Sequence, residues 1–267
     1  MGFSERQALM LEEMGIRVWT RAEGAVPAEA LVEAAPEPVP APAPAPTPRA
    51  PAAVPSAPTR EPAIQVVARG DRPTGTETMD WPALREAVTG CTACGLCQGR
   101  TQTVFGVGNE RAHWMVVGEA PGEQEDRQGE PFVGKSGQLL DNMLRALGLT
   151  RDEAGPERQV YIANTVKCRP PGNRNPEPQE LAQCEPFLMR QIALLQPRVI
   201  LAMGRFAVQS LLRSNEPIGR LRGRVHSYQG VPLVVTYHPA YLLRNPEDKG
   251  RAWDDLCLAR EVLAPEG

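Results

Sequence analysis

Short apolar runs alternate with longer segments of helical periodicity through the second half of the chain. Four runs have the length of buried strands: residues 113–118, 159–164, 198–203 and 231–237. Between and after them, helical spacing predicts helices over residues 136–149, 178–195, 205–213 and 248–263. Ser136 is expected to cap the first of these helices. Strands that alternate with helices predict a parallel sheet covered on both faces. The expected fold class is therefore α/β, a three-layer αβα architecture with a central, mostly parallel, four-stranded sheet.

The N-terminal part of the chain follows a different pattern. Residues 5–20 have the apolar spacing of one short amphipathic helix. Residues 36–58 are almost entirely Pro and Ala, a composition that cannot bury a core and favours an extended tether. The sequence therefore predicts three parts. They are a short amphipathic interaction segment over 1–30, a Pro/Ala-rich disordered linker over 31–79, and a folded domain over 80–267.

Charge and hydropathy exclude several classes of protein. The formal net charge of −3 excludes a chain that is basic throughout. Six arginines lie between Arg198 and Arg224 with Glu216 as the single acid, which is typical of either a solvated face or a phosphate-contacting surface. No run is apolar over the roughly 20 residues that a membrane span needs, and the N-terminus lacks the features of a secretory signal. We therefore expect a cytoplasmic protein with no membrane partner.

The cysteines have the spacing of a metal site. Three of them form a CxxCxxC motif, two follow fifteen residues apart, and one stands alone: Cys91, Cys94, Cys97, Cys168, Cys184 and Cys257. Without an export signal, metal or cluster ligation is favoured over a disulfide framework. The spacing leaves zinc and an iron–sulfur cluster as alternatives. Cys257 lies in the middle of a predicted helix and is expected to pack in the core.

Unusual residues follow the predicted strands at their carboxyl ends, where ligands bind in open parallel sheets. A GEAPG segment, residues 118–122, ends the first strand, Asn164 ends the second, and His238 follows the fourth. The sequence therefore predicts a functional site at this edge of the sheet.

A phosphate-loop motif is present by letters but not by context. Residues 129–136 read GEPFVGKS, which fits the pattern GxxxxGK[ST]. A phosphate loop must follow a buried strand directly, whereas residues 123–128 are EQEDRQ, acidic and polar. We interpret most of that acidic run as a solvated loop and do not expect nucleotide hydrolysis.

Four stretches in order, residues 116–126, 131–141, 161–184 and 238–246, together resemble the family 4 (iron–sulfur) uracil-DNA glycosylases. The resemblance runs from about Cys91 to the last helix and does not cover residues 1–80. It implies a [4Fe–4S] cluster with four ligands: Cys91, Cys94, Cys168 and Cys184. If the register were shifted by three residues, Cys94 and Cys97 would be the first pair.

The resemblance also implies an activity. The protein would flip uracil out of single- or double-stranded DNA and hydrolyse its N-glycosidic bond, leaving an abasic site for base excision repair. Phe132 would stack on the base, Asn164 would read its edge, and His238 would donate to O2 as negative charge develops there. The alternative is a metal-stapled nucleic-acid binding module without catalysis, and the sequence leaves it open.

Further roles follow from the same resemblance. The implied uracil-binding residues include, besides those three, Gly118, Glu119 and Ala120. Two carboxylates are candidates for activating water: Glu119 and, as the weaker one, Glu125. A wedge that would press into the minor groove consists of Leu242, Leu243 and Arg244.

The N-terminal segment has a possible partner of its own. Residues 11–25 weakly resemble the N-terminal peptide of the psi subunit of the bacterial clamp loader, which binds the chi subunit. The shared pattern consists of Leu11, Met14, Gly15, Ile16 and Trp19. It implies recruitment to replication forks, and so a nucleoid-associated bacterial protein. The alternative is a nonspecific amphipathic tail. Nothing in the sequence demands a dimer, so we expect a monomer.

Overall fold

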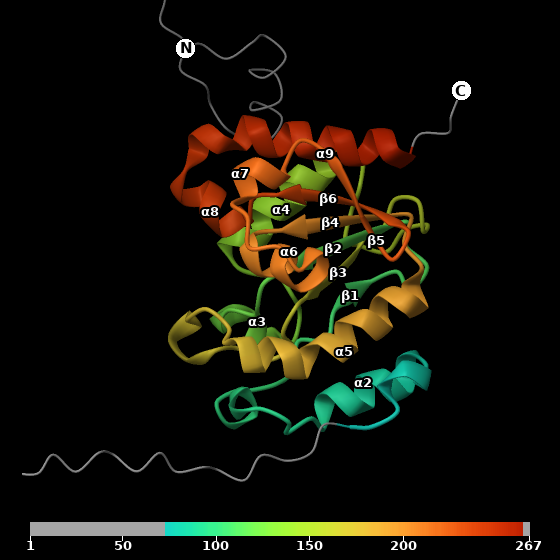
Figure 1. The fold of residues 1–267 in the computed structure, drawn as a ribbon, viewed down its shortest axis with the longest axis vertical. Coiled ribbons are helices and arrows are strands. Elements are labelled where there is room, and N and C mark those ends of the chain that lie inside the picture. The colour runs from blue at the N-terminus through green and yellow to red at the C-terminus, as the bar shows by residue number, and fades with distance from the viewer. Residues whose placement is uncertain (1–72, 264–267) are drawn as a thin grey trace, which may run out of the picture. The chain divides into compact units, whose positions relative to one another are not determined.

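A computed structural model describes residues 73–263, and its centre is a six-stranded sheet with the order β1-β3-β2-β4-β6-β5 (Figure 1). The four inner strands run parallel: β2 (Trp114–Gly118), β3 (Tyr161–Asn164), β4 (Val199–Met203) and β6 (Val231–Thr236). They confirm the four predicted strands. Two short antiparallel strands, which were not predicted, complete the edges: β1 (Val107–Gly108) and β5 (Val225–Tyr228).

Helices cover both faces of the sheet (Figure 1). One face packs against α4 (Lys135–Ala146), α8 (Pro239–Arg244) and α9 (Lys249–Leu263). The other packs against α5 (Pro178–Leu195), α6 (Arg205–Leu212) and α7 (Ile218–Leu221). The predicted three-layer αβα class is confirmed. The helix α2 (Trp81–Thr89) lies against α5 and begins at the N-cap Asp80, whose carboxylate accepts the Ala83 N–H at 3.0 Å.

The inner strands are apolar without interruption because both faces of the sheet are covered. In β2, Trp114 and Val116 point toward α4 and α9, whereas Met115 and Val117 point toward α5 and α6. Successive side chains of a strand point to opposite faces, so one strand contributes to two separate cores. A third core lies between α2, α5 and the cysteine-containing segments.

Two local predictions between β2 and α4 were wrong. The acidic run is not a solvated loop but the helix α3 (Glu123–Gln128), and Asp126 within it is buried and accepts the Thr101 N–H. Ser136 is not the cap of the next helix, because α4 begins at Lys135 with Gly134 as N-cap. The Glu125 carboxylate accepts the Gly134 N–H at 3.1 Å, so this N-terminal N–H is satisfied from α3.

The residues before the phosphate-loop motif form α3 rather than a strand, which agrees with the prediction against nucleotide hydrolysis. Helix α4 begins at Lys135, within the motif, as in a phosphate loop, but the strand β2 ends at Gly118, eleven residues before Gly129. The backbone therefore lacks the strand–loop–helix geometry that cups phosphates.

The predicted helix over 5–20, the interaction segment and most of the Pro/Ala linker lie outside the described residues, and the domain boundaries stay a prediction. Among the helices of residues 73–263, none combines the length and apolar character required to span a bilayer.

Candidate active site

The carboxyl ends of the parallel strands open into a cleft of about 930 Å³. Five of the six predicted uracil-binding residues line it: Glu119, Ala120, Phe132, Asn164 and His238. These residues come from separate segments of the chain and line the same cleft. This confirms the prediction that the carboxyl ends of the strands bring them together at one edge of the sheet. The cleft is large enough for a nucleotide base and its sugar.

Asn164 presents an unusual polar atom to this cleft. It ends β3, lies beside Gly118 of β2 in the sheet register, and is 2% exposed. Its side-chain oxygen Oδ1 is buried and accepts no hydrogen bond from the described residues. Leaving such an acceptor unsatisfied costs about 1–3 kcal/mol, so a ligand that donates an N–H to it gains correspondingly.

Gly118 lies in close contact with two site residues, Asn164 and Phe132. A Cβ atom at Gly118 would lie 2.5 Å from Asn164 Oδ1 and 2.5 Å from Cζ of Phe132. No real side chain fits at that distance, so the close approach of the two side chains depends on this glycine. Phe132 itself is 5% exposed and has a left-handed φ of 56°, which costs a non-glycine residue about 1–2 kcal/mol.

His238 is fixed as a neutral hydrogen-bond donor. It caps α8, and its Nδ1 accepts the Ala240 N–H at 3.1 Å, so the ring proton resides on Nε2. Burial, and secondarily the charge of Arg244, lowers the pKa of His238 to about 4. Its ring lies 5.3 Å from that of Phe132, centroid to centroid. The imidazole can therefore donate from Nε2 beside the Phe132 ring at neutral pH.

The two candidate carboxylates differ in their surroundings. Glu119 lines the cleft, and burial raises its pKa, an effect that the charge of Arg205 opposes. Within residues 73–263, no backbone N–H donates to the Glu119 carboxylate. It therefore retains acceptor capacity toward a ligand or water.

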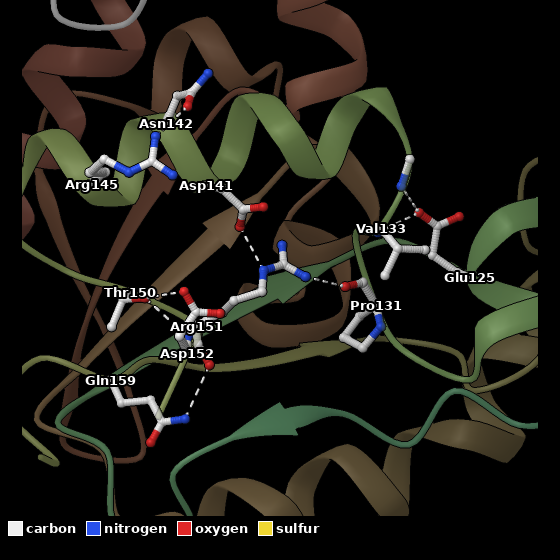
Figure 2. Close-up of polar contacts among 11 residues, drawn as sticks. Glu125, Pro131, Val133, Asp141, Asn142, Arg145, Thr150, Arg151, Asp152 and Gln159 are labelled. Carbon is white, nitrogen blue, oxygen red and sulfur yellow. Dashed lines mark hydrogen bonds and ion pairs between the residues drawn. The ribbon is translucent and has the colours of Figure 1, made fainter. Parts of the chain in front are cut away.

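Glu125 also lines the cleft, but backbone groups bind its carboxylate (Figure 2). Oε1 accepts the N–H of Val133 at 2.9 Å and of Gly134 at 3.1 Å, and Oε2 accepts that of Gly122 at 3.1 Å. These three backbone donors occupy most of the acceptor capacity of the carboxylate and leave little for a water molecule. This geometry favours Glu119 over Glu125 for activating water.

The predicted DNA wedge is wrong in one residue. Leu242 is fully buried in the core with α4 and α9, so it cannot enter a DNA groove. Leu243 is 45% exposed and Arg244 lines the cleft. Because neighbouring residues of a helix point about 100° apart, α8 cannot direct all three side chains outward.

The arginine-rich segment does not form a single free surface. Arg222 pairs with the buried Asp255 at 3.0 Å, and Arg213 pairs with Glu185. Arg205 lines the cleft beside Glu119. Part of this segment therefore stabilises the fold, and one arginine faces the site.

A second cavity lies between α2 and α5, and five of the six cysteines line it: Cys91, Cys94, Cys97, Cys168 and Cys184. Two cations face it, Arg100 and Lys167, and Arg100 Nη1 donates to Cys168 Sγ at 3.1 Å. Cys257 lies apart, in α9, and packs in the core as predicted. Within residues 73–263, no three His, Cys, Asp or Glu side chains surround a single ion-sized point.

Lys167 connects this cavity to the cleft, and sequence reasoning missed it. The side chain is completely buried, and Nζ donates to the Asn164 carbonyl at 2.8 Å and to Gln191 Oε1 at 2.6 Å. Burial lowers the pKa of Lys167 to about 8. A lysine directly before Cys168, three residues after the end of the apolar strand β3, was the available signal. Arg151, which contacts the loop that carries Phe132, carried no comparable signal.

These features define an α/β protein with a base-sized cleft at the carboxyl ends of its strands and a thiol-lined cavity behind it. The chain belongs to the uracil-DNA glycosylase superfamily, whose family model matches residues 105–257. Its similarity to family 4, inferred from the four motifs, is confirmed by the comparisons that follow.

A type-4 uracil-DNA glycosylase of Thermotoga maritima is 42% identical over 186 residues, covering 68% of this chain and 94% of that protein. One of Archaeoglobus fulgidus is also 42% identical, over 60% of this chain and 81% of that protein. A type-5 uracil-DNA glycosylase of Pyrobaculum aerophilum is less similar, at 34% identity over 51% of this chain.

Proposed function

We propose that this protein is a uracil-DNA glycosylase of base excision repair, which takes uracil from DNA into the cleft and hydrolyses its N-glycosidic bond. The observation that carries the proposal is the buried, unpartnered Oδ1 of Asn164 in a cleft that also holds Phe132 and His238. Family membership and the type-4 relatives support it.

Base selection follows from hydrogen-bond chemistry. Uracil carries an N3–H that donates to Asn164 Oδ1, whereas N3 of cytosine is an acceptor and would leave that oxygen unsatisfied. Phe132 stacks on the base, and the backbone of Gly118 and Ala120 contacts its edge. Discrimination by an unsatisfied buried polar group is strong.

Bond cleavage follows from the neutral His238. As the C1′–N1 bond breaks, its electron pair moves to uracil, and the Nε2–H of His238 donates to O2, where negative charge develops. Water adds to C1′ and passes a proton to Glu119, whose pKa is raised by burial, which makes it a stronger base than an exposed carboxylate. The products are an abasic site and the uracil anion, which takes up a proton from solvent while Glu119 releases its own.

The test is excision from single-stranded DNA that contains one uracil, followed by alkaline cleavage. We expect cleavage at uracil and none at thymine, with much weaker cleavage by His238→Ala. His226→Ala is the matched control, because His226 lies on the edge strand β5 and contacts Leu221 O. Tight DNA binding without cleavage by the wild type would refute the glycosylase and favour the binding module.

We propose that the thiol-lined cavity holds a [4Fe–4S] cluster, with Cys91, Cys94, Cys168 and Cys184 as its ligands. Five thiols line one cavity, which supplies the four cysteine ligands that such a cluster requires, each bonded to a different iron. Arg100 and Lys167 offset the negative charge of four thiolates. Bound there, the cluster would tie the CxxCxxC segment to α5.

Iron content and the visible absorbance of the purified protein test this assignment. We expect Cys168→Ala to lose both, whereas Cys257→Ala, a control in the apolar core, retains both. Cys97→Ser decides the register: retained iron supports Cys91 as the ligand, and lost iron supports Cys97.

For residues 1–30, we propose the clamp-loader chi subunit as partner, on the sequence pattern alone. The test is capture of purified chi by the full chain, with Trp19→Ala as the variant. Capture that Trp19→Ala abolishes supports the proposal, and the absence of capture refutes it.

A further inference from the structure

Two charged side chains, Arg151 and Glu125, form hydrogen bonds with the backbone of the loop that carries Phe132, one on each side of that residue (Figure 2). This loop joins α3 to α4. Arg151 Nη1 donates to the carbonyl oxygen of Pro131 at 3.0 Å, and Glu125 Oε1 accepts the N–H of Val133 at 2.9 Å. The two contacts fall on the residues immediately before and after Phe132.

These contacts fix the two peptide planes that flank Phe132. Arg151 orients the carbonyl of the preceding peptide, and Glu125 orients the N–H of the following one. Because peptide units are planar, φ and ψ of a residue are the rotations of these two planes about its Cα. Holding both planes therefore holds Phe132 at its left-handed φ of 56°.

Further hydrogen bonds hold the Arg151 and Glu125 side chains in place. Arg151 Nε donates to Asp141 Oδ1 of α4 at 2.6 Å, and the Arg151 carbonyl accepts from Gln159 Nε2 at 3.1 Å (Figure 2). The Arg151 side chain is only 15% exposed. Glu125 is tied to its own helix through the Gly122 N–H. The loop is therefore held against two rigid helices rather than against mobile surface groups.

Steric fit adds a third restraint. A Cβ atom at Gly137, in the first turn of α4, would lie 1.7 Å from the Phe132 carbonyl oxygen. The loop backbone therefore packs directly on α4, and the left-handed residue cannot relax toward that helix.

We propose that Arg151, together with Glu125, is a positioning residue that keeps the Phe132 ring in place to stack on the base and so sets the affinity for uracil. The inference rests on the proposed function, in which Phe132 stacks on the base. Without Arg151 the Pro131 carbonyl rotates, φ of Phe132 relaxes to a negative value, and the ring leaves its place beside His238.

The first test compares inhibition by free uracil among variants. We expect Arg151→Gln to weaken uracil inhibition by about tenfold, because misplaced binding groups lose the benefit of pre-organisation. Arg151→Lys keeps the charge but not the fork that reaches Asp141 and Pro131 together, so we expect a similar loss. Arg145→Gln is the matched control: Arg145 is exposed on α4 and contacts Asn142. Unchanged inhibition in Arg151→Gln would overturn the proposal.

A double-mutant cycle separates positioning from general stabilisation. In Phe132→Ala there is no ring to place, so adding Arg151→Gln should weaken uracil inhibition no further. A second, independent tenfold loss would mean that Arg151 acts on the base by another route, and would refute the positioning role.

Amide hydrogen exchange tests whether Arg151 holds the loop, independently of any measurement of uracil binding or excision. In Arg151→Gln, a peptide that includes Val133 and Gly134 should exchange at least severalfold faster than in Arg145→Gln. Equal exchange rates would contradict this role of Arg151. The wild type could fail to excise uracil while Arg151→Gln still exchanges faster. In that case the proposed function is wrong, but the role of Arg151 in holding the loop is supported.

Discussion

Lowering the pH should lower the free energy of unfolding through His238. The substitution His238→Asn should remove this contribution to the pH dependence of stability. The pKa of this histidine is about 4 in the folded protein, against an ordinary value of 6.5. The cause is burial first and the charge of Arg244 second. In the unfolded chain both are absent, so the ordinary value applies.

The sign follows from which state binds the proton first. Between pH 6.5 and 4 the unfolded chain is protonated at this position while the folded protein is not, so acid favours unfolding. Stability is complete above about pH 6.5 and decreases as the pH falls toward 4. The gap between the two pKa values corresponds to about 3 kcal/mol at most, at 1.36 kcal/mol for each pH unit.

Urea denaturation of the wild type and of His238→Asn at pH 7 and pH 4.5 measures this effect. Asn is chosen because its Oδ1 can accept the Ala240 N–H as Nδ1 does, so the cap of α8 is kept. Other titrating groups are common to both proteins and cancel in the comparison. We expect the stability of the variant relative to the wild type to increase by about 2 kcal/mol between pH 7 and pH 4.5. A difference that does not change with pH would refute the neutral, buried histidine.

Three further changes test other parts of the structure. Gly118→Ala should lower kcat/KM by about 100-fold with little loss of thermal stability. The added Cβ would lie 2.5 Å from Asn164 Oδ1 and would push this atom from its place in the cleft. Activity near that of the wild type would contradict the requirement for glycine at this position. Leu242→Ala should lower the free energy of unfolding by about 3 kcal/mol, and Leu243→Ala by less than about 0.5 kcal/mol, in urea denaturation; equal losses would contradict their opposite burial. Lys167→Met should lower it by about 2 kcal/mol, since two buried acceptors lose their donor; an unchanged midpoint would argue against the buried contacts.

Local patterns were sufficient for the elements that form the frame. The helix predicted over 178–195 has those bounds in the structure, and the four parallel strands were placed to within two residues. These elements are amphipathic or continuously apolar over their whole length, so periodicity alone identifies them. The meeting of Asn164 and His238 at one edge followed from the parallel sheet.

The errors lie where a distant side chain decides the local structure. Ser136 looked like a helix cap, but the Glu125 carboxylate satisfies the start of α4 from another helix. Leu242 belongs to a motif that suggested a DNA wedge, but α9 and α4 bury it. A one-dimensional pattern does not contain these partners, because each comes from a separate segment of the chain.

The sequence by itself determined the class of fold, the edge of the sheet that bears the cleft, and the residue types that meet there. Hydrophobic period and strand–helix alternation are local properties, and they constrain topology strongly. Only the tertiary structure decided that Asn164 Oδ1 is left without a donor, that His238 is neutral, and that Phe132 is held left-handed by Arg151 and Glu125. Hydrogen-bond satisfaction, pKa and backbone strain depend on distances of a few ångströms between segments far apart in the chain, and those distances exist only after packing.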